Sequence, residues 1–262
     1  MLFSRLAITS IVGALLLSCG GPQVEPRKSE NRYKIAVEFY RDGKYPQAEK
    51  EAERALAHNP RNHEAHNLLG LVDLILAIKN LNLVEVSDCL TGVDAEGLRL
   101  EMDEKLKAAA KHFERAFALD PKYGEALQNR GLVAMSLEDY PTAIKYYELA
   151  LQHPTRLRDA SLTRANLGWA YFHQKDEVRA AKELRQSLQF KPGMCIGRYR
   201  LARVYFARGE WEKALEKFRE VAADTQCQTA FTTLQQETSL YIAKTLTKTA
   251  EHPQNRITGL QP

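Results

Sequence analysis

The chain has 262 residues and a formal net charge of +4, with charges of both signs spread along its length. Hydrophobic residues make up 44% and charged residues 27%, which excludes wholesale disorder and is typical of a chain that buries a core. Because the positive excess is small and diffuse, we expect no nucleic-acid partner.

The first segment of the chain has the pattern of an export signal. Arg5 precedes an apolar run from Leu6 to Leu17, which ends at Ser18 and Cys19. This run is too short to span a bilayer as a helix but suits the core of a signal peptide. The segment resembles the bacterial lipobox, which implies that residues 1–18 are a lipoprotein signal peptide and that Cys19 is the lipidation site. The alternative is an ordinary secretory signal with an incidental cysteine.

The residues after Cys19 predict where the mature chain resides. Gly20 follows the cysteine, and in Gram-negative lipoproteins, which this segment resembles, a non-acidic residue there implies an anchor in the outer membrane, on its periplasmic face. Residues 19–30 are polar and contain two prolines, so we expect a flexible tether. This compartment is oxidising, and disulfides persist in it.

A recurring pattern of small residues and prolines covers residues 31–252. The spacing of Ala48, Ala55 and Pro60 recurs at 109–121 and, with single departures, twice more downstream. Small residues let two antiparallel helices approach closely, and a proline stops the second helix. The pattern resembles the tetratricopeptide repeat, a helix–turn–helix unit. That resemblance implies an all-α, right-handed superhelical solenoid of about five to six repeats.

One repeat is interrupted by an insertion at about residues 77–104. Predicted helices at Glu64–Leu76 and Lys107–Pro121 flank it, and it is rich in leucine and valine. We expect extended helices that protrude from the solenoid, with a turn near Thr91–Asp94. Such an insertion either forms part of a binding face or packs as a helical hairpin on its own solenoid.

Two cysteines near the C-terminal end are separated by about one repeat. Cys195 and Cys227 are 32 residues apart, so both are expected at the start of first helices in neighbouring repeats, within disulfide reach. A pair of buried thiols is the alternative. Cys89 lies in the insertion and is expected to be a buried apolar residue, with an intermolecular bond as its alternative. A helical cap is expected from Cys227 to about Glu251, followed by a C-terminal tail at 253–262.

The sequence contains no recognised catalytic constellation, since it lacks GxSxG, a Walker loop, HExxH and paired CxxC motifs. His63 and His66 share one helix face, but no cysteine or glutamate cluster follows at metal-ligand spacing. We interpret them as surface histidines. We therefore expect no enzyme, no cofactor, no metal and no small-molecule substrate.

The resemblance to tetratricopeptide proteins also implies which side chains line the concave groove. Trp169 and Phe172 are three residues apart and therefore share one helix face. An apolar and aromatic groove accepts the apolar face of a helix or an extended segment. The implied groove residues are Tyr33, Val37, Tyr40, Gln128, Leu132, Met135, Leu162, Trp169, Phe172, His173, Tyr199, Arg203 and Phe206.

A lipobox, about six repeat units and a cysteine pair one repeat apart together resemble the type IV pilus biogenesis lipoproteins of the PilF, PilW and Tgl kind. The resemblance implies a pilotin: acylated Cys19 would anchor the chain while the groove holds subunits of the type IV pilus secretin until they close into a ring. The alternatives are a scaffold for outer-membrane β-barrel assembly and an adaptor for peptidoglycan enzymes.

Overall fold

The computed structural model describes residues 24–85, 94–153, 156–230 and 232–251. The predicted signal peptide, Cys19, Cys89 and the C-terminal tail at 253–262 lie outside the described residues. Within the described ranges the regular structure consists of α-helices and no strand. The prediction of an all-α repeat solenoid is therefore confirmed.

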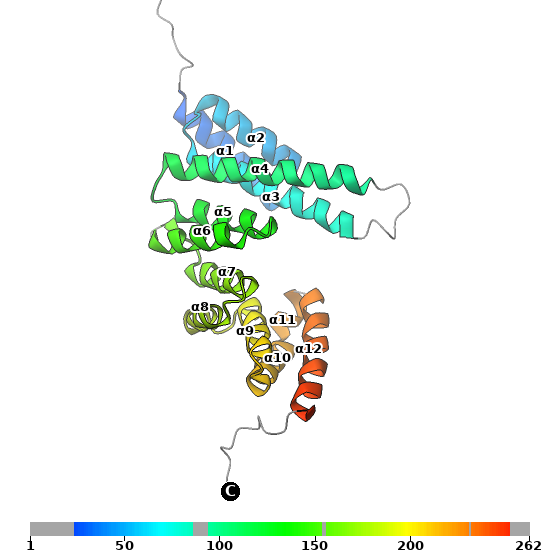
Figure 1. The fold of residues 1–262 in the computed structure, drawn as a ribbon. Helices are drawn as coiled ribbons and strands as arrows, with labels where there is room; N and C mark the ends of the chain where they lie inside the picture. The colour runs from blue at the N-terminus through cyan, green and yellow to red at the C-terminus, as the bar shows by residue number, and fades with distance from the viewer. Residues whose placement is uncertain (1–23, 86–93, 154–155, 231, 252–262) are drawn as a thin grey trace, which may run out of the picture.

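The helices pack in chain order as antiparallel pairs, and the pairs stack into a solenoid (Figure 1). The pairs are α1 with α2, α3 with α4, α5 with α6, α7 with α8, and α9 with α10, and α12 covers α10 at the C-terminal end. In chain order the helices are α1 (Pro26–Arg41), α2 (Tyr45–His58), α3 (His63–Glu85), α4 (Ala95–Leu119), α5 (Gly124–Ser136), α6 (Tyr140–Gln152), α7 (Ala160–His173), α8 (Glu177–Phe190), α9 (Cys195–Ala207), α10 (Trp211–Ala223), α11 (Thr225–Ala230) and α12 (Thr232–Glu251).

The first helix begins at Pro26, inside the segment 19–30 that we expected to be a flexible tether. Proline suits the first turn of a helix because the N–H it lacks would have no partner within the helix there. The Glu25 N–H donates to the His58 carbonyl oxygen at 2.9 Å, and the Glu25 carboxylate contacts His58 Nδ1 at 2.9 Å. The chain is therefore tied to the end of α2 from Glu25 onward, which shortens the expected tether.

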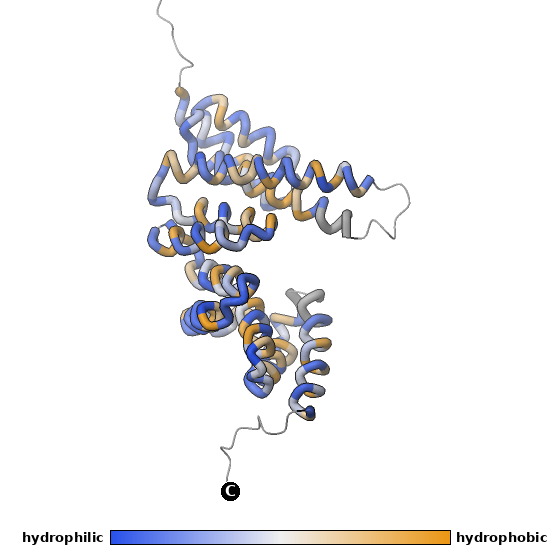
Figure 2. Tube along the Cα trace, viewed as in Figure 1, coloured by the Kyte–Doolittle hydropathy of each residue, from blue (hydrophilic) through white to orange (hydrophobic). Residues whose placement is uncertain are grey.

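Small residues allow the two helices of a repeat to pack closely, as their spacing predicts. A Cβ atom on Gly70 would lie 2.7 Å from a ring carbon of Phe113, and one on Gly131 would lie 2.6 Å from the ring of Tyr147. Phe113 and Tyr147 are both fully buried. Each of these rings therefore fills the space that a glycine leaves in the facing helix. Hydrophobic and hydrophilic positions are interspersed along the helices (Figure 2).

The insertion lengthens α3 and α4 to 23 and 25 residues, and Figure 1 shows both helices projecting past the neighbouring pairs. Their inner parts pack on the solenoid, where Lys105 Nζ contacts Asp73 at 2.9 Å and Glu49 of α2 at 3.2 Å. Burial raises the pKa of Asp73 above its usual range. Farther out, Leu100 is 64% exposed. The insertion is thus anchored at its base, and among its described residues it presents Ile78 and Leu100 to solvent.

The second helices α4, α6 and α8 begin at aspartate N-caps, of which Asp176 is representative. Its carboxylate accepts a hydrogen bond from the backbone N–H of Arg179 at 2.9 Å and forms an ion pair with the Arg179 guanidinium. The Arg179 N–H and guanidinium hold the pKa of Asp176 below its usual value of 3.8. The ionised carboxylate therefore stabilises the start of α8.

Replacing Asp176 by alanine should lower the free energy of unfolding by about 1 kcal/mol at neutral pH. The pKa of Asp176 is lower in the folded than in the unfolded protein. The stabilisation that comes from its charge is therefore fully present at a pH above the unfolded-state pKa, and it is lost as the pH falls through the folded-state pKa. Urea unfolding of both proteins over acidic pH should show the gap narrowing. Asp176→Asn keeps a capping side chain that does not titrate. If the difference in free energy of unfolding between wild type and each variant stays constant with pH, the charge of Asp176 does not contribute to stability.

Candidate partner-binding groove

The first helices of successive repeats, α3, α5, α7 and α9, lie next to one another and are joined by polar side chains. Five of the six residues involved are buried and Arg200 is half-buried, and each makes a hydrogen bond that offsets the cost of removing it from water. These bonds hold the wall of the groove in one arrangement. They run from Asn129 Nδ2 to Asn67 Oδ1 at 3.0 Å, from Thr163 Oγ1 to Gln128 Oε1 at 2.5 Å, and from Arg200 Nη1 to Asn166 Oδ1 at 2.7 Å.

The N-terminal section of the groove is a cavity of about 190 Å³. The three predicted residues of α1, Tyr33, Val37 and Tyr40, all line it. Asn67 and Leu71 of α3 also line the cavity, although neither was among the predicted groove residues. Asn67 and Leu71 have the same spacing from the small residue Gly70 that Tyr33 and Val37 have from Ala36 in the first repeat. Aligning the interrupted repeat with the first one would therefore have predicted them.

Paired charges form the rim of this section. The Arg156 guanidinium lies 4.5 Å from the Tyr123 ring centre and bonds to Asp120 and, at 3.3 Å, to Glu64. Burial raises the pKa of Tyr33, and the charge of Glu64 adds to this effect. The phenol hydroxyl of Tyr33 therefore keeps its proton at neutral pH. This rim offers hydroxyl groups and charges that are already compensated.

At the C-terminal end of the predicted groove, which we call its C-terminal section, a cluster of aromatic rings surrounds Trp169. The Trp169 ring stacks on Phe172 with centroids 5.0 Å apart and contacts His173 edge-on at 4.8 Å. Tyr140, which the sequence analysis missed, stacks on His173 at 4.7 Å. Burial lowers the pKa of His173, and the charge of Arg203 lowers it further, so this ring is neutral at neutral pH. Trp169 and Phe172 are half-buried and His173 is exposed, so the cluster faces solvent in part.

Two arginines of α9 flank the Trp169 ring. The guanidinium carbons of Arg200 and Arg203 lie 5.4 and 5.6 Å from its centre. Arg203 was predicted to line the groove, whereas Arg200 was not. Arg200 lies at the position that the buried Asn166 holds in the preceding repeat, two residues before the small residue of the helix, so the repeat register did not mark it as a groove residue.

The prediction that Gln128 and Tyr199 line the open groove is wrong. Gln128 is 9% exposed and accepts a hydrogen bond from Thr163, and Tyr199 is 3% exposed. The Tyr199 hydroxyl donates to Glu237 of α12. A terminal repeat needs a cover for its apolar face, and α12 supplies it here.

Helix α12 also contacts two other predicted groove residues at the C-terminal end, Phe206 and Arg203. Tyr241 of α12 contacts Phe206 edge-on at 5.4 Å and lies 4.3 Å from the Arg203 guanidinium. Farther toward the N-terminus, three predicted groove residues are half-buried and pack against the core. They are Leu132, Met135 and Leu162.

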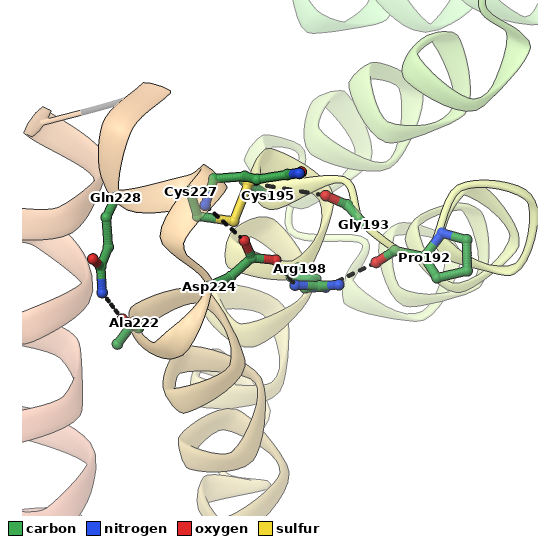
Figure 3. The surroundings of a disulfide bond; sticks show 9 residues. Pro192, Gly193, Cys195, Arg198, Ala222, Asp224, Cys227 and Gln228 are labelled. Carbon is green, nitrogen blue, oxygen red and sulfur yellow. Dashed lines mark hydrogen bonds and ion pairs between the residues drawn. A yellow bond between two sulfur atoms is a disulfide. The ribbon is translucent and has the colours of Figure 1, made fainter.

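The structure contains the expected disulfide between Cys195 and Cys227, whose Cα atoms are 5.4 Å apart (Figure 3). Cys195 begins α9, as expected, but Cys227 lies inside the short helix α11 rather than at the start of a first helix. An ion pair of 2.8 Å between Arg198 and Asp224 lies beside the bond. The disulfide therefore ties α9 to the capping helices.

The two histidines that we interpreted as surface residues are partly buried and have partners. His66 Nδ1 lies 3.2 Å from His112 Nδ1 of α4, and His63 Nε2 lies 3.0 Å from Arg156. Burial lowers the pKa of both His66 and His112. Among the described residues, no three histidine, cysteine or carboxylate side chains group so as to hold a metal.

In the part of the chain that the structure describes, no helix has the length and apolarity that a membrane crossing requires. A comparison of the sequence with curated proteins found no significant match. A tetratricopeptide-repeat family model matches residues 33–73 and 95–160.

Several solved structures share the fold. PilW, a widely conserved type IV pilus biogenesis factor, aligns with a TM-score of 0.61 and 22% identity over 87% of this chain and 90% of its own. PilF of Pseudomonas aeruginosa aligns with a TM-score of 0.58 and 17% identity over 87% and 93% of the two chains. A thermophilic tetratricopeptide protein of Thermus thermophilus, TTC0263, aligns with a TM-score of 0.55 and 17% identity over 84% and 99%. The chain therefore carries a match to the tetratricopeptide repeat over residues 33–73 and 95–160, and the fold of its solenoid is similar to those of the pilus biogenesis proteins PilF and PilW.

Proposed function

We propose that this protein is a lipid-anchored scaffold of the outer membrane that binds secretin subunits in its groove and promotes their assembly for type IV pilus biogenesis. The observation that supports this proposal best is an aromatic groove, centred on Trp169 and Phe172, on a solenoid similar to those of PilF and PilW. Tetratricopeptide solenoids are typically non-enzymatic scaffolds that bind other proteins.

The groove suits this role because its wall is held by internal bonds before a partner arrives. Buried pairs such as Asn67 with Asn129 connect neighbouring repeats, so little side-chain freedom is lost on binding. Acylation at Cys19 would hold the groove close to the membrane surface, and confinement raises the effective concentration of captured subunits relative to one another. The protein would thereby favour ring closure without any covalent chemistry.

The direct test measures secretin assembly in a strain that lacks this protein. Outer-membrane fractions are blotted for the heat-stable secretin multimer after complementation with wild type or with Cys19→Ala. We expect the multimer to disappear in the deletion strain and to return only with wild type. An intact multimer in the deletion strain would rule out secretin as the client and would favour β-barrel assembly or peptidoglycan enzymes as the process served.

Replacing Trp169 and Phe172 together by alanine should weaken capture of the secretin by at least about 30-fold, because buried aromatic anchors commonly contribute 2 kcal/mol or more at interfaces. Affinity is measured with the purified secretin and immobilised protein, and circular dichroism verifies the fold. Phe190→Ala removes an aromatic side chain that is 72% exposed at the end of α8, and it should leave affinity unchanged. Equal affinity for all three proteins would place the binding surface elsewhere.

A further inference from the structure

Arg200 is a half-buried cation without a counter-charge. Its side chain donates to the neutral Asn166 amide at 2.7 Å and lies beside the Trp169 ring, and it forms no ion pair with any described carboxylate. Toward the core it faces Tyr147, whose fully buried hydroxyl has no hydrogen-bond partner among the described residues. Burial lowers the pKa of Arg200 to about 10, so the guanidinium remains positive at neutral pH although it has lost much of its hydration.

This environment differs from that of the other arginines. Those that are partly buried, such as Arg164 and Arg198, form ion pairs with Glu183 and Asp224 at 2.8 Å. Every described arginine that lacks an ion pair with a described carboxylate is exposed to solvent, apart from Arg200 and its neighbour Arg203. Water can compensate an exposed guanidinium, whereas a half-buried one relies on a nearby acceptor or anion.

Arg203 adds a second positive charge at the same place. Its Nη1 donates to the Tyr199 oxygen at 3.0 Å, while the Tyr199 hydroxyl donates a hydrogen bond to the Glu237 carboxylate of α12. The charges that act on the pKa of His173 show the same balance, because Arg203, Lys175 and Arg200 lower it and Glu138 raises it. The aromatic cluster therefore lies in a region of excess positive charge.

The N-terminal section of the groove has the opposite arrangement. Its arginines Arg156 and Arg158 are paired with Asp120, Glu64 and Glu125. Arg41, which also lines the cavity, forms no ion pair with a described carboxylate but is exposed to solvent. An anionic ligand gains little there because carboxylates or water already compensate these charges. Among the described residues, only the C-terminal section combines half-buried arginines that lack an ion pair with apolar rings.

We propose that the C-terminal section of the groove binds an acidic segment of the partner, which places a carboxylate against Arg200 and Arg203 and an apolar side chain against Trp169 and Phe172. The identity of the protein that carries this segment rests on the proposed function. The charge complementarity rests on the groove alone. A carboxylate is preferred because a guanidinium binds its two oxygens in matched geometry and regains the charge compensation that burial removed.

The experiment uses the fluorescence of Trp169 as the readout. The chain has two tryptophans, so Trp211→Phe leaves Trp169 as the only one. The probe is a short blocked peptide of alternating glutamate and leucine, and the matched probe replaces each glutamate by glutamine. We expect the glutamate peptide to change the Trp169 emission and to bind at least about 10-fold more tightly than the glutamine peptide, with the difference shrinking as salt is raised.

Variants assign this preference to residues. Arg200→Gln and Arg203→Gln should each remove most of the preference for glutamate, while Arg200→Lys should retain part of it. Arg219→Gln removes an exposed arginine of α10 that has no ion pair with a described residue, and it should change nothing. If Arg200→Gln does not fold, the comparison of the two peptides on the Trp211→Phe protein, together with Arg203→Gln, still tests the proposal. Equal affinity for the two peptides, or an unchanged preference in a folded Arg200→Gln protein, would overturn the proposal.

A parallel measurement of secretin capture separates this inference from the proposed function. Secretin capture without any preference for glutamate would overturn the acidic-segment site and leave the secretin role standing. A glutamate preference that depends on Arg200, without secretin capture, would support the site and show that the segment belongs to another protein.

Discussion

Replacing Phe113 by alanine should lower the free energy of unfolding by about 3–5 kcal/mol. The Phe113 ring is fully buried between α4 and α3, where Gly70 leaves the space that the ring fills. Removing it forfeits the burial of an aromatic side chain and leaves a cavity, which the facing glycine cannot fill because it has no side chain. Urea unfolding followed by circular dichroism measures the loss.

Phe190→Ala supplies the matched control for this prediction. Phe190 ends α8 and is 72% exposed, so the same substitution there should change the free energy of unfolding by no more than about 0.5 kcal/mol. A comparable loss for Phe113→Ala and Phe190→Ala would show that the pairing of ring and glycine does not hold α3 against α4.

Cleaving the disulfide between Cys195 and Cys227 should lower the free energy of unfolding by about 3–4 kcal/mol, because the bond closes a loop of roughly one repeat and restricts the unfolded chain. Each repeat contacts only its neighbours, so the loss should concentrate in α9 to α12. The cap formed by α12 covers Tyr199 and Phe206, and its loosening would expose these rings at the end of the groove.

Unfolding with and without reductant measures this effect, and limited proteolysis locates it. The double variant Cys195→Ser with Cys227→Ser should match the reduced wild type and should not respond to reductant. Alkylation followed by mass spectrometry establishes the bond itself: if both thiols react without prior reduction, the disulfide is absent from the protein and the stability difference should vanish.

The helices and their pairing were predictable because their causes are local. Small residues such as Gly70 and Gly131 recur at a fixed distance from the alanines of the second helix, and this spacing alone requires two helices in close contact. The separation of the two cysteines by about one repeat predicted their proximity in the same way. Position in the repeat also identified Trp169 and Phe172 as neighbours on one face.

The tertiary structure alone decided which of these positions face a partner. Tyr199 has the repeat position of a groove residue but is buried, because α12 returns over the last repeat and its Glu237 accepts a hydrogen bond from the Tyr199 hydroxyl. Nothing in the sequence distinguishes Arg200 from the other charged residues. Only the folded chain shows that it is half-buried and forms no ion pair with a described carboxylate. Periodicity along the chain determines helices and their contacts. Solvent exposure and charge compensation depend on groups distant in sequence, and these come together only when the solenoid and its cap have formed.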